Sequence, residues 1–189
     1  MTFVVDGTNG LTFNDATTQS STATNASNIS SGTLGKPRLP TGSVLQVVQG
    51  ILTTGLTSTS STYINTGLSA TITPTSATSK ILIFASATAG IANHLDSYYF
   101  TIFRDSTNLN YGASGIPAMA RQYQQSASNL ASDGFQMNLN YLDSPATTSA
   151  TTYSVRIKND GNGSTMHFGR IVSSGDGHGG TIQLMEISA

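Results

Sequence analysis

The stretch Gly134–Asp143 reads Gly-Phe-Gln-Met-Asn-Leu-Asn-Tyr-Leu-Asp and alternates apolar side chains with amides. Residues two apart on a β-strand face the same side of the sheet, so this pattern is typical of a strand with one buried and one solvated face. A surface helix would instead repeat its apolar residues every three or four positions. The stretch therefore predicts an antiparallel sheet with one wet face.

Similar β-type runs follow one another along most of the chain. They lie at residues 44–52, 63–72, 79–87, 98–104, 152–158, 165–172 and 181–187. The most apolar of them, 79–87, has the length of a central strand, and 63–72 predicts a strand that bends or bulges around Thr66-Gly67. About eight strands without an amphipathic helix between them predict an all-β antiparallel sandwich, with the jelly roll as first choice.

Residues 1–42 differ from this pattern. No charged residue lies between Asp15 and Lys36, and Gly, Ser, Thr and Asn dominate. Such a composition buries too little apolar surface to order alone, so one interpretation is a disordered tail. The other is an extended arm that orders against a partner through short apolar groups. These groups contain Phe3, Val4, Val5, Leu11, Phe13, Ile29 and Leu34. We expect an attachment arm at 1–42 and a β-sandwich head at 43–189.

Charged residues are scarce along the whole chain. Asp, Glu, Lys and Arg make up 9% of the 189 residues, where an average globular domain has about 25%. Because the net charge is −1 and no block of Lys or Arg occurs, we expect no nucleic-acid partner. No apolar run approaches the roughly 20 residues that span a bilayer, so we expect no membrane insertion.

The sequence has no Cys. Disulfides, thiolate nucleophiles and Cys-based zinc sites are therefore excluded, and packing or assembly must hold the fold together. The first residues also lack the basic region and long apolar stretch of a secretion leader. These features are typical of an object that is assembled in a cell and released by lysis.

Two segments of the arm resemble the start of tailed-phage tail fibres and other phage virion proteins. Asp6–Ser20 reads Asp-Gly-Thr-Asn-Gly-Leu-Thr-Phe-Asn-Asp-Ala-Thr-Thr-Gln-Ser, with Asn-Asp-Ala where those proteins usually carry Pro-Asp-Gly. Asn28–Pro40 is similar to the linker that follows in them. Gly42–Val48 and Asn65–Pro74 resemble the opening of β-sandwich heads in marine and cyanobacterial phage structural proteins. The resemblance covers about the first 85 residues.

The resemblance implies a homotrimeric short tail fibre, located in the virion and assembled in the host cytoplasm. Its arm would attach to other virion proteins of the tail, baseplate or capsid, and its jelly-roll head would face the host. The residues by themselves indicate assembly but do not set the number three. Short jelly-roll proteins with extended arms also serve as capsid decoration (cement), which is the alternative function.

The best candidate contact surface lies in residues 112–129, where the lack of alternation predicts a loop. Tyr and Arg offer large contact area, and amides suit the hydroxyl groups of a host surface glycan. A structural crossover at a subunit interface is the competing interpretation. Together with the turns at 159–163 and 175–180, this surface gives the predicted receptor-binding residues Arg121, Gln122, Tyr123, Gln124, Asn162 and His178.

We expect no catalytic residues, metal ligands or cofactor. A hydrolase needs a nucleophile with a base, or two carboxylates that face one site. His94-Leu95-Asp96 beside Ser97 is not evidence for such a triad. Three copies of His178 around an axis would gather three imidazoles, but the chain lacks a His-x-His pair, and a solvated turn is the simpler interpretation. The protein is therefore expected not to be an enzyme, and a glycan-cleaving spike is the least favoured alternative.

Overall fold

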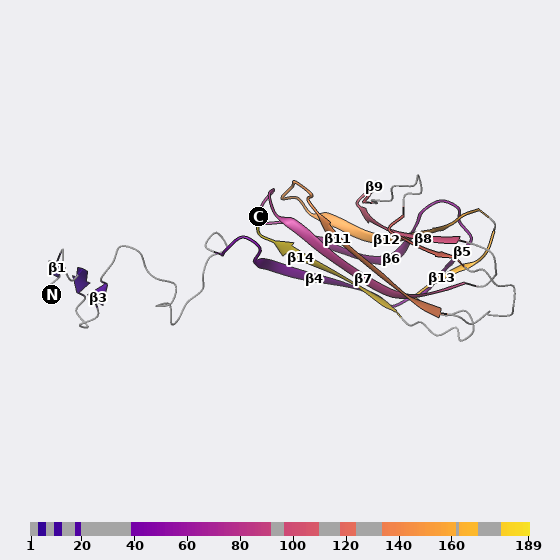
Figure 1. The fold of residues 1–189 in the computed structure, drawn as a ribbon, viewed down its shortest axis with the longest axis horizontal. Coiled ribbons are helices and arrows are strands. Elements are labelled where there is room, and N and C mark those ends of the chain that lie inside the picture. Colours follow the sequence, from indigo (N-terminus) through magenta and orange to yellow (C-terminus); the bar gives the residue numbers. More distant parts are fainter. Residues whose placement is uncertain are drawn as a thin grey trace. The chain divides into compact units, whose positions relative to one another are not determined.

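The computed structural model describes residues 4–6, 10–12, 18–19, 39–91, 97–109, 118–123, 134–161, 163–169 and 179–189. It divides the chain into two compact units, Met1–Leu39 and Pro40–Ala189 (Figure 1). In the first unit, β1 (Val4–Asp6), β2 (Gly10–Thr12) and β3 (Thr18–Gln19) form an antiparallel sheet in that order. Phe3, Phe13, Ile29 and Leu34 lie outside the described residues, so the attachment role of this segment stays a prediction.

The second unit, which we call the head, is an antiparallel sandwich. Its main strands are β4 (Val44–Leu52), β6 (Ile64–Ile72), β7 (Lys80–Ile91), β8 (Ser97–Arg104), β10 (Ala120–Tyr123), β11 (Gly134–Asp143), β12 (Thr151–Asn159) and β14 (Gly180–Ile187). Short strands β5 (Leu56–Ser58), β9 (Thr107–Asn108) and β13 (Met166–Phe168) extend the sheets. None of the described residues is helical.

The strand order identifies the sandwich as a jelly roll. The first sheet runs β4-β14-β7-β11 and the second runs β10-β8-β12-β6. In Figure 1 the four strands of the first sheet lie side by side. Among the eight main strands, each sheet therefore combines strands from both halves of the chain, as two interlocked Greek keys require. The predicted fold class is confirmed.

β7 lies inside its sheet, as its apolar run predicts. One edge pairs with β14 and then with β13, and the other edge pairs with β11. The inward side chains Ile81 and Ile83 have no exposed area. In β11, Met137 and Leu139 are buried, which confirms the alternation that predicted this strand.

β6 contains the expected bulge. Asn65 pairs with Arg156 and Ser69 with Ser154, so four steps along β6 match two along β12. Gly67 adopts a φ of +86° at this point, a region that glycine enters without steric cost. Thr66 donates a 2.8 Å hydrogen bond to the carbonyl of Val155 and fills the gap in the ladder.

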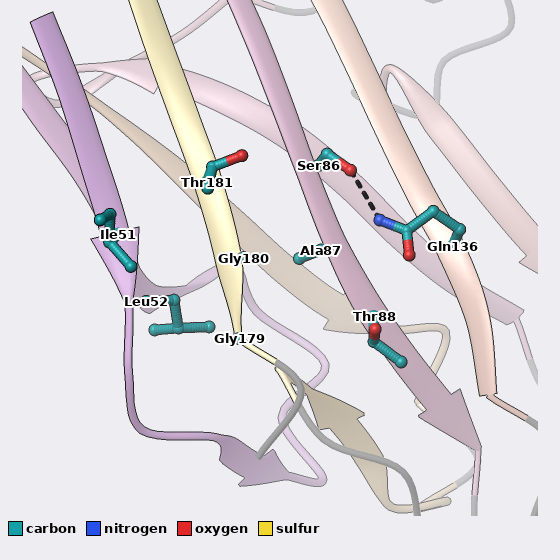
Figure 2. A pocket seen from close by; sticks show the side chains of 9 residues that line it. All are labelled: Ile51, Leu52, Ser86, Ala87, Thr88, Gln136, Gly179, Gly180 and Thr181. Carbon is teal, nitrogen blue, oxygen red and sulfur yellow. Dashed lines mark hydrogen bonds between the residues drawn. The ribbon is translucent and has the colours of Figure 1, made fainter.

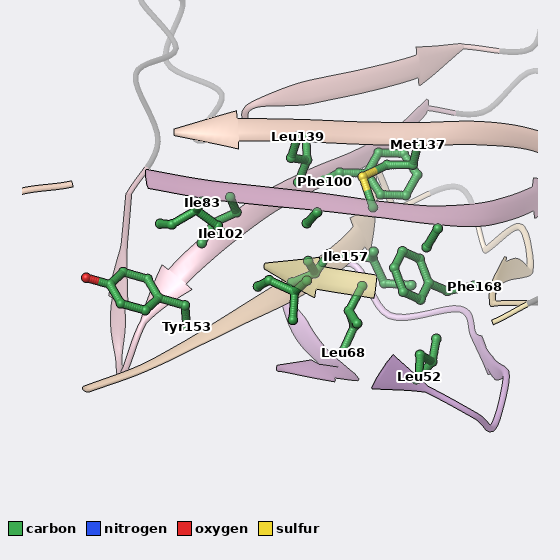
Figure 3. Packing of buried hydrophobic residues seen from close by; sticks show 14 of the residues in the cluster. Leu52, Leu68, Ile83, Phe100, Ile102, Met137, Leu139, Tyr153, Ile157 and Phe168 are labelled. Atoms are coloured by element: carbon green, nitrogen blue, oxygen red, sulfur yellow. The ribbon is translucent and has the colours of Figure 1, made fainter. Parts of the chain in front are cut away.

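The core lies between the two sheets. Figure 3 shows Phe100 and Ile157 from the second sheet meeting Leu139 and Phe168 from the first. Each aliphatic or aromatic side chain that is fully removed from water contributes roughly 1.5–3 kcal/mol. Because the chain has no Cys, this packing and the polar links below hold the head together.

A buried polar cluster joins the sheets near the ends of β11 and β12. The Asp143 carboxylate accepts hydrogen bonds from Arg104 Nη1 at 3.0 and 2.9 Å and from Tyr153 Oη at 2.7 Å. Burial and the bond to Asp143 raise the pKa of Tyr153, so its hydroxyl stays a neutral donor. Since Asp143 belongs to the first sheet and both donors to the second, the cluster fixes the sheets relative to each other.

A second set of contacts joins β4 to β6 and its following turn. A Cβ on Gly50 would overlap the carbonyl oxygen of Ser69, so the close approach of β4 to β6 requires glycine. Gln46 Nε2 donates to the carbonyl of Thr73 at 2.8 Å and to the fully buried Glu186 at 2.6 Å. Glu186 also accepts two 2.7 Å hydrogen bonds from the amide and hydroxyl of Thr75.

Candidate functional site

Arg121 and its neighbours lie on a strand, which corrects the loop predicted for 112–129. Residues 120–123 form β10 along the edge of β8, with Arg121 opposite Tyr99 and Tyr123 opposite Ser97. The run Ala-Arg-Gln-Tyr has no apolar alternation, so its sequence alone does not predict a strand. It becomes one because β8 has an open edge to pair with.

Of the other predicted contact residues, only Gln122 and Tyr123 lie within the described part of the chain. Gln122 pairs with Tyr98, whose side chain is in the core, so Gln122 belongs to the inner side of the sheet rather than to its outer surface. Gln124, Asn162 and His178 lie outside the described residues, as do His94 and Asp96. Receptor binding by these residues stays a prediction.

The outer face of the second sheet carries three cations above three aromatic rings. We call this surface the cationic face. It consists of Arg121 on β10, Arg156 and Lys158 on β12, Tyr99 and Phe103 on β8, and Tyr63 just before β6. These residues are far apart in the sequence, and only the strand registers place Arg121 and Lys158 on opposite sides of Tyr99.

Each cation lies over a ring. The Arg156 guanidinium is 4.0 Å from the Phe103 centroid, Lys158 Nζ is 5.2 Å from both Tyr63 and Tyr99, and the Arg121 guanidinium is 5.7 Å from Tyr99. Tyr63 also meets Phe103 edge to face at 5.8 Å. Burial and the neighbouring Tyr99 raise the pKa of Tyr63, so the ring keeps its proton and does not neutralise Lys158.

The Arg121 side chain is also held by a residue of β8. Its Nε and Nη2 donate to the Ser97 hydroxyl at 3.0 and 2.6 Å. Such contacts hold long side chains in one arrangement, which reduces the entropy that a ligand must remove on binding. The cationic face is therefore a fixed set of positive charges suited to binding anions.

The outer face of the first sheet has the opposite character. A row of apolar side chains, Val47, Met185, Leu82 and Leu142, crosses all four strands in register. Val44 and Phe84 lie beside this row, and we call the six residues the apolar face. Val47 is 57% exposed, Leu142 49% and Phe84 43%. Among the outward positions of the described strands of this sheet, Lys80 alone is charged.

A hollow of about 340 Å³ opens at the other end of the same sheet (Figure 2). Ser86, Gln136 and Thr181 line it with hydroxyl and amide groups, and Gln136 Nε2 donates to the Ser86 hydroxyl at 2.6 Å. A Cβ on Gly180 would come within 2.7 Å of that of Ala87, so the close approach of β14 to β7 beside the hollow requires glycine. The lining has no charged or titratable group.

The described part of the chain offers no cluster of metal ligands. No group of three or more His, Cys, Asp or Glu side chains there can hold a metal ion. His167 is mostly buried, with Nδ1 3.4 Å from the Thr57 hydroxyl. No helix among these residues is long and apolar enough to cross a membrane.

No protein-family model matches the sequence, and no curated protein matches it either. Among solved structures, the chain is similar to VP2 of infectious bursal disease virus. The VP2 subviral particle gives a TM-score of 0.43 at 14% identity, over 84% of this chain and 42% of VP2. The T13 particle of the same virus gives 0.41 at 12% identity, over 84% and 40%. Because both TM-scores are below 0.5, we infer no function from these similarities.

Proposed function

We propose that this chain is a non-enzymatic structural protein of a phage virion, in which the heads self-associate, as a homotrimer, into a short tail fibre. The resemblance of residues 6–20 and 28–40 to phage virion proteins supports the virion location. The jelly-roll head preceded by a separate N-terminal unit fits the arm-and-head plan of such fibres. The observation that carries self-association is the apolar face.

The apolar face has the chemistry of a subunit interface. Exposed apolar patches of several hundred Å² are uncommon on monomeric proteins and mark interaction surfaces. Four strands about 4.8 Å apart and about eight residues long present roughly 500 Å² of sheet plane, and side-chain relief enlarges the area available for contact. A stable interface buries about 800 Å² per partner, so the whole outer surface of this sheet, with the apolar face as its core, supplies most of what is needed.

A second copy of the chain is the occupant that suits this face. Self-association brings identical surfaces close together, so any charge on them would be repeated and would repel. The row of Val47, Met185, Leu82 and Leu142 carries no charge, and Lys80 lies outside it. The amide and hydroxyl groups farther along the same sheet, such as Gln49, Gln183 and Asn140, suit the polar rim that surrounds an interface core.

Light scattering on the full chain tests this assembly. We expect a trimer at micromolar concentration and a monomer for Leu142→Lys, because a charge would then be buried in the contact. Thr71→Lys is the matched control, since Thr71 is an exposed strand position on the second sheet. A monomeric wild-type protein, or equal effects of the two substitutions, would remove the basis of the proposed interface.

Capsid decoration remains the second candidate, because a self-associating jelly-roll head with an arm suits both positions in a virion. Counting copies of the protein per particle separates the two. A tail fibre should number in the tens at most and a decoration protein in the hundreds.

A further inference from the structure

The cationic face concentrates positive charge in a protein that has little charge. Arg121 and Lys158 flank Tyr99 from the two neighbouring strands, which places their backbones roughly 10 Å apart. Arg156 lies two residues from Lys158 on the same side of β12, roughly 7 Å away. Three of the chain's eight Lys and Arg residues thus occupy one patch.

Among the described residues, no carboxylate forms an ion pair with Arg156 or Lys158. Within the described part of the chain, Lys158 contacts the rings of Tyr63 and Tyr99, and Arg156 contacts the ring of Phe103. Asp105 is nearby, but Arg156 Nη2 donates to its backbone carbonyl at 3.0 Å, and its carboxylate accepts the amide of Thr152. Arg104, by contrast, forms a 2.9 Å ion pair with Asp143.

Two of the three rings beneath the cations, those of Tyr99 and Phe103, are covered, and Tyr63 is partly buried. Tyr99 is 6% and Phe103 9% exposed, so neither offers a free face on which a nucleotide base could stack. The remaining outward groups on the neighbouring strands are hydroxyls and amides, including Thr71, Thr152 and Asn65. A ligand for this surface must therefore bring anionic groups for the cations and hydroxyl groups for the polar neighbours.

We propose that the cationic face binds an anionic polysaccharide that carries carboxylate or sulfate groups. Arg156 and Lys158 offer positively charged N–H donors to the acidic groups. The inference rests on the proposed function for its biological source, a polysaccharide of the host surface. Binding itself is a property of the isolated protein.

Titration calorimetry with defined polymers tests the proposal. We expect the full chain to bind polygalacturonate or dextran sulfate, and to bind neutral dextran at least tenfold more weakly. Affinity for the acidic polymer should fall as salt rises from 50 to 200 mM, because charge contacts release counterions. Equal binding of neutral dextran, or no binding of either acidic polymer, would overturn the proposal.

Matched variants locate the site. Lys158→Met and Arg156→Met keep an unbranched stem over the rings and remove the charge, and together they should weaken binding at least roughly tenfold. Lys80→Met removes one charge of the same kind from the other sheet and should change affinity less than twofold. If Lys80→Met weakens binding as much as Lys158→Met, net charge rather than the cationic face binds the polymer.

Two further outcomes are decisive. Single-stranded DNA that binds as tightly as the acidic polysaccharide would show nonspecific attraction of polyanions and would overturn the proposed ligand class. Particle copy number and light scattering test the virion assembly independently. Polymer binding that is lost while the trimer and the copy number hold contradicts this inference alone.

Discussion

The two outer faces of the head both carry apolar side chains, but one face covers them with cations and the other leaves them exposed. The second sheet has aromatic side chains on its outer surface and covers them with Arg121, Arg156 and Lys158. The first sheet has aliphatic side chains and leaves them bare. A cation over a ring keeps apolar area out of water while its charge stays solvated. The cationic face is therefore compatible with solvent, whereas the apolar face leaves its side chains exposed to water in the single chain.

Truncating a phenylalanine on each face gives the largest expected contrast. Phe103 is 9% exposed under Arg156, whereas Phe84 is 43% exposed. Phe103→Ala should lower the free energy of unfolding by about 3–5 kcal/mol, as for other buried aromatic residues. Phe84→Ala should lower it by less than about 1 kcal/mol in dilute, monomeric protein, while weakening self-association. Chemical denaturation at low and high protein concentration measures both effects. Equal losses for the two variants would mean that the faces do not differ.

A methyl group at Gly50 should disturb the contact between β4 of the first sheet and β6 of the second sheet. Gly50→Ala would push β4 away from Ser69 on β6, and backbone cannot yield as a side chain can. We expect a loss of about 3 kcal/mol in the free energy of unfolding, within the range for overpacking. Gly42→Ala is the control, because a Cβ there meets nothing within 4 Å, although its φ of +90° adds some strain. A Gly50→Ala head as stable as the wild type would contradict the close approach.

A low pH should destabilise the first sheet, because Glu186, the one acidic residue of β14, points into the head. Burial raises the pKa of Glu186, but the hydrogen bonds from Gln46 and Thr75 outweigh it and hold the pKa below the usual value. An unfolded glutamate titrates near pH 4.3. Glu186 therefore stabilises the head fully above about pH 4.3, and this stabilisation is lost as the pH falls through the lower folded value.

Glu186→Gln isolates this effect. At pH 7 the variant should unfold about 2 kcal/mol more easily, since hydrogen bonds to a charged acceptor are weakened. Its stability should then change less between pH 5 and 3 than that of the wild type. Thermal melts across this pH range make the comparison, and parallel acid profiles for both proteins would exclude Glu186 as the cause.

Removal of residues 1–42 should have the smallest effect on the head. Both faces and the core lie within the second unit, so the shortened protein should unfold cooperatively and keep its stability within about 1 kcal/mol. It should no longer be incorporated into particles. Loss of cooperative unfolding would show that the N-terminal segment belongs to the core.

The sequence predicts those strands whose own residues carry a clear pattern. The alternation in β11, the apolar run of β7 and the bulge at Thr66-Gly67 are local, and each is found where expected. β10 is missed because its residues carry no pattern of their own and form a strand only beside β8. Jelly-roll topology is a first choice from strand count, and strand order alone confirms it.

The two surfaces are harder to foresee for the same reason. The sequence predicts Arg121 as a contact residue, but Tyr63, Phe103 and Lys158 join it only through the registers of three strands. In β4 and β7, apolar residues occupy both sides of the strand. Such a run predicts a strand that is buried on both faces. Val47 and Phe84 are exposed instead, because no other part of the described chain covers them.

The pairing of the first and last main strands sets the order of events when the head is made. The Ser188 amide donates to the Ser43 carbonyl and the Gly42 amide donates to the Ser188 carbonyl, each at 2.9 Å. Among the described strands of its sheet, β4 pairs with β14 alone. A ribosome that has just released β4 must therefore extend the chain to residue 187 before that strand has its full ladder. Until then, an edge bearing Val44, Val47 and Ile51 stays open, and strands of other nascent copies can pair with it. Rapid completion of the C-terminus thus protects the beginning of the same head.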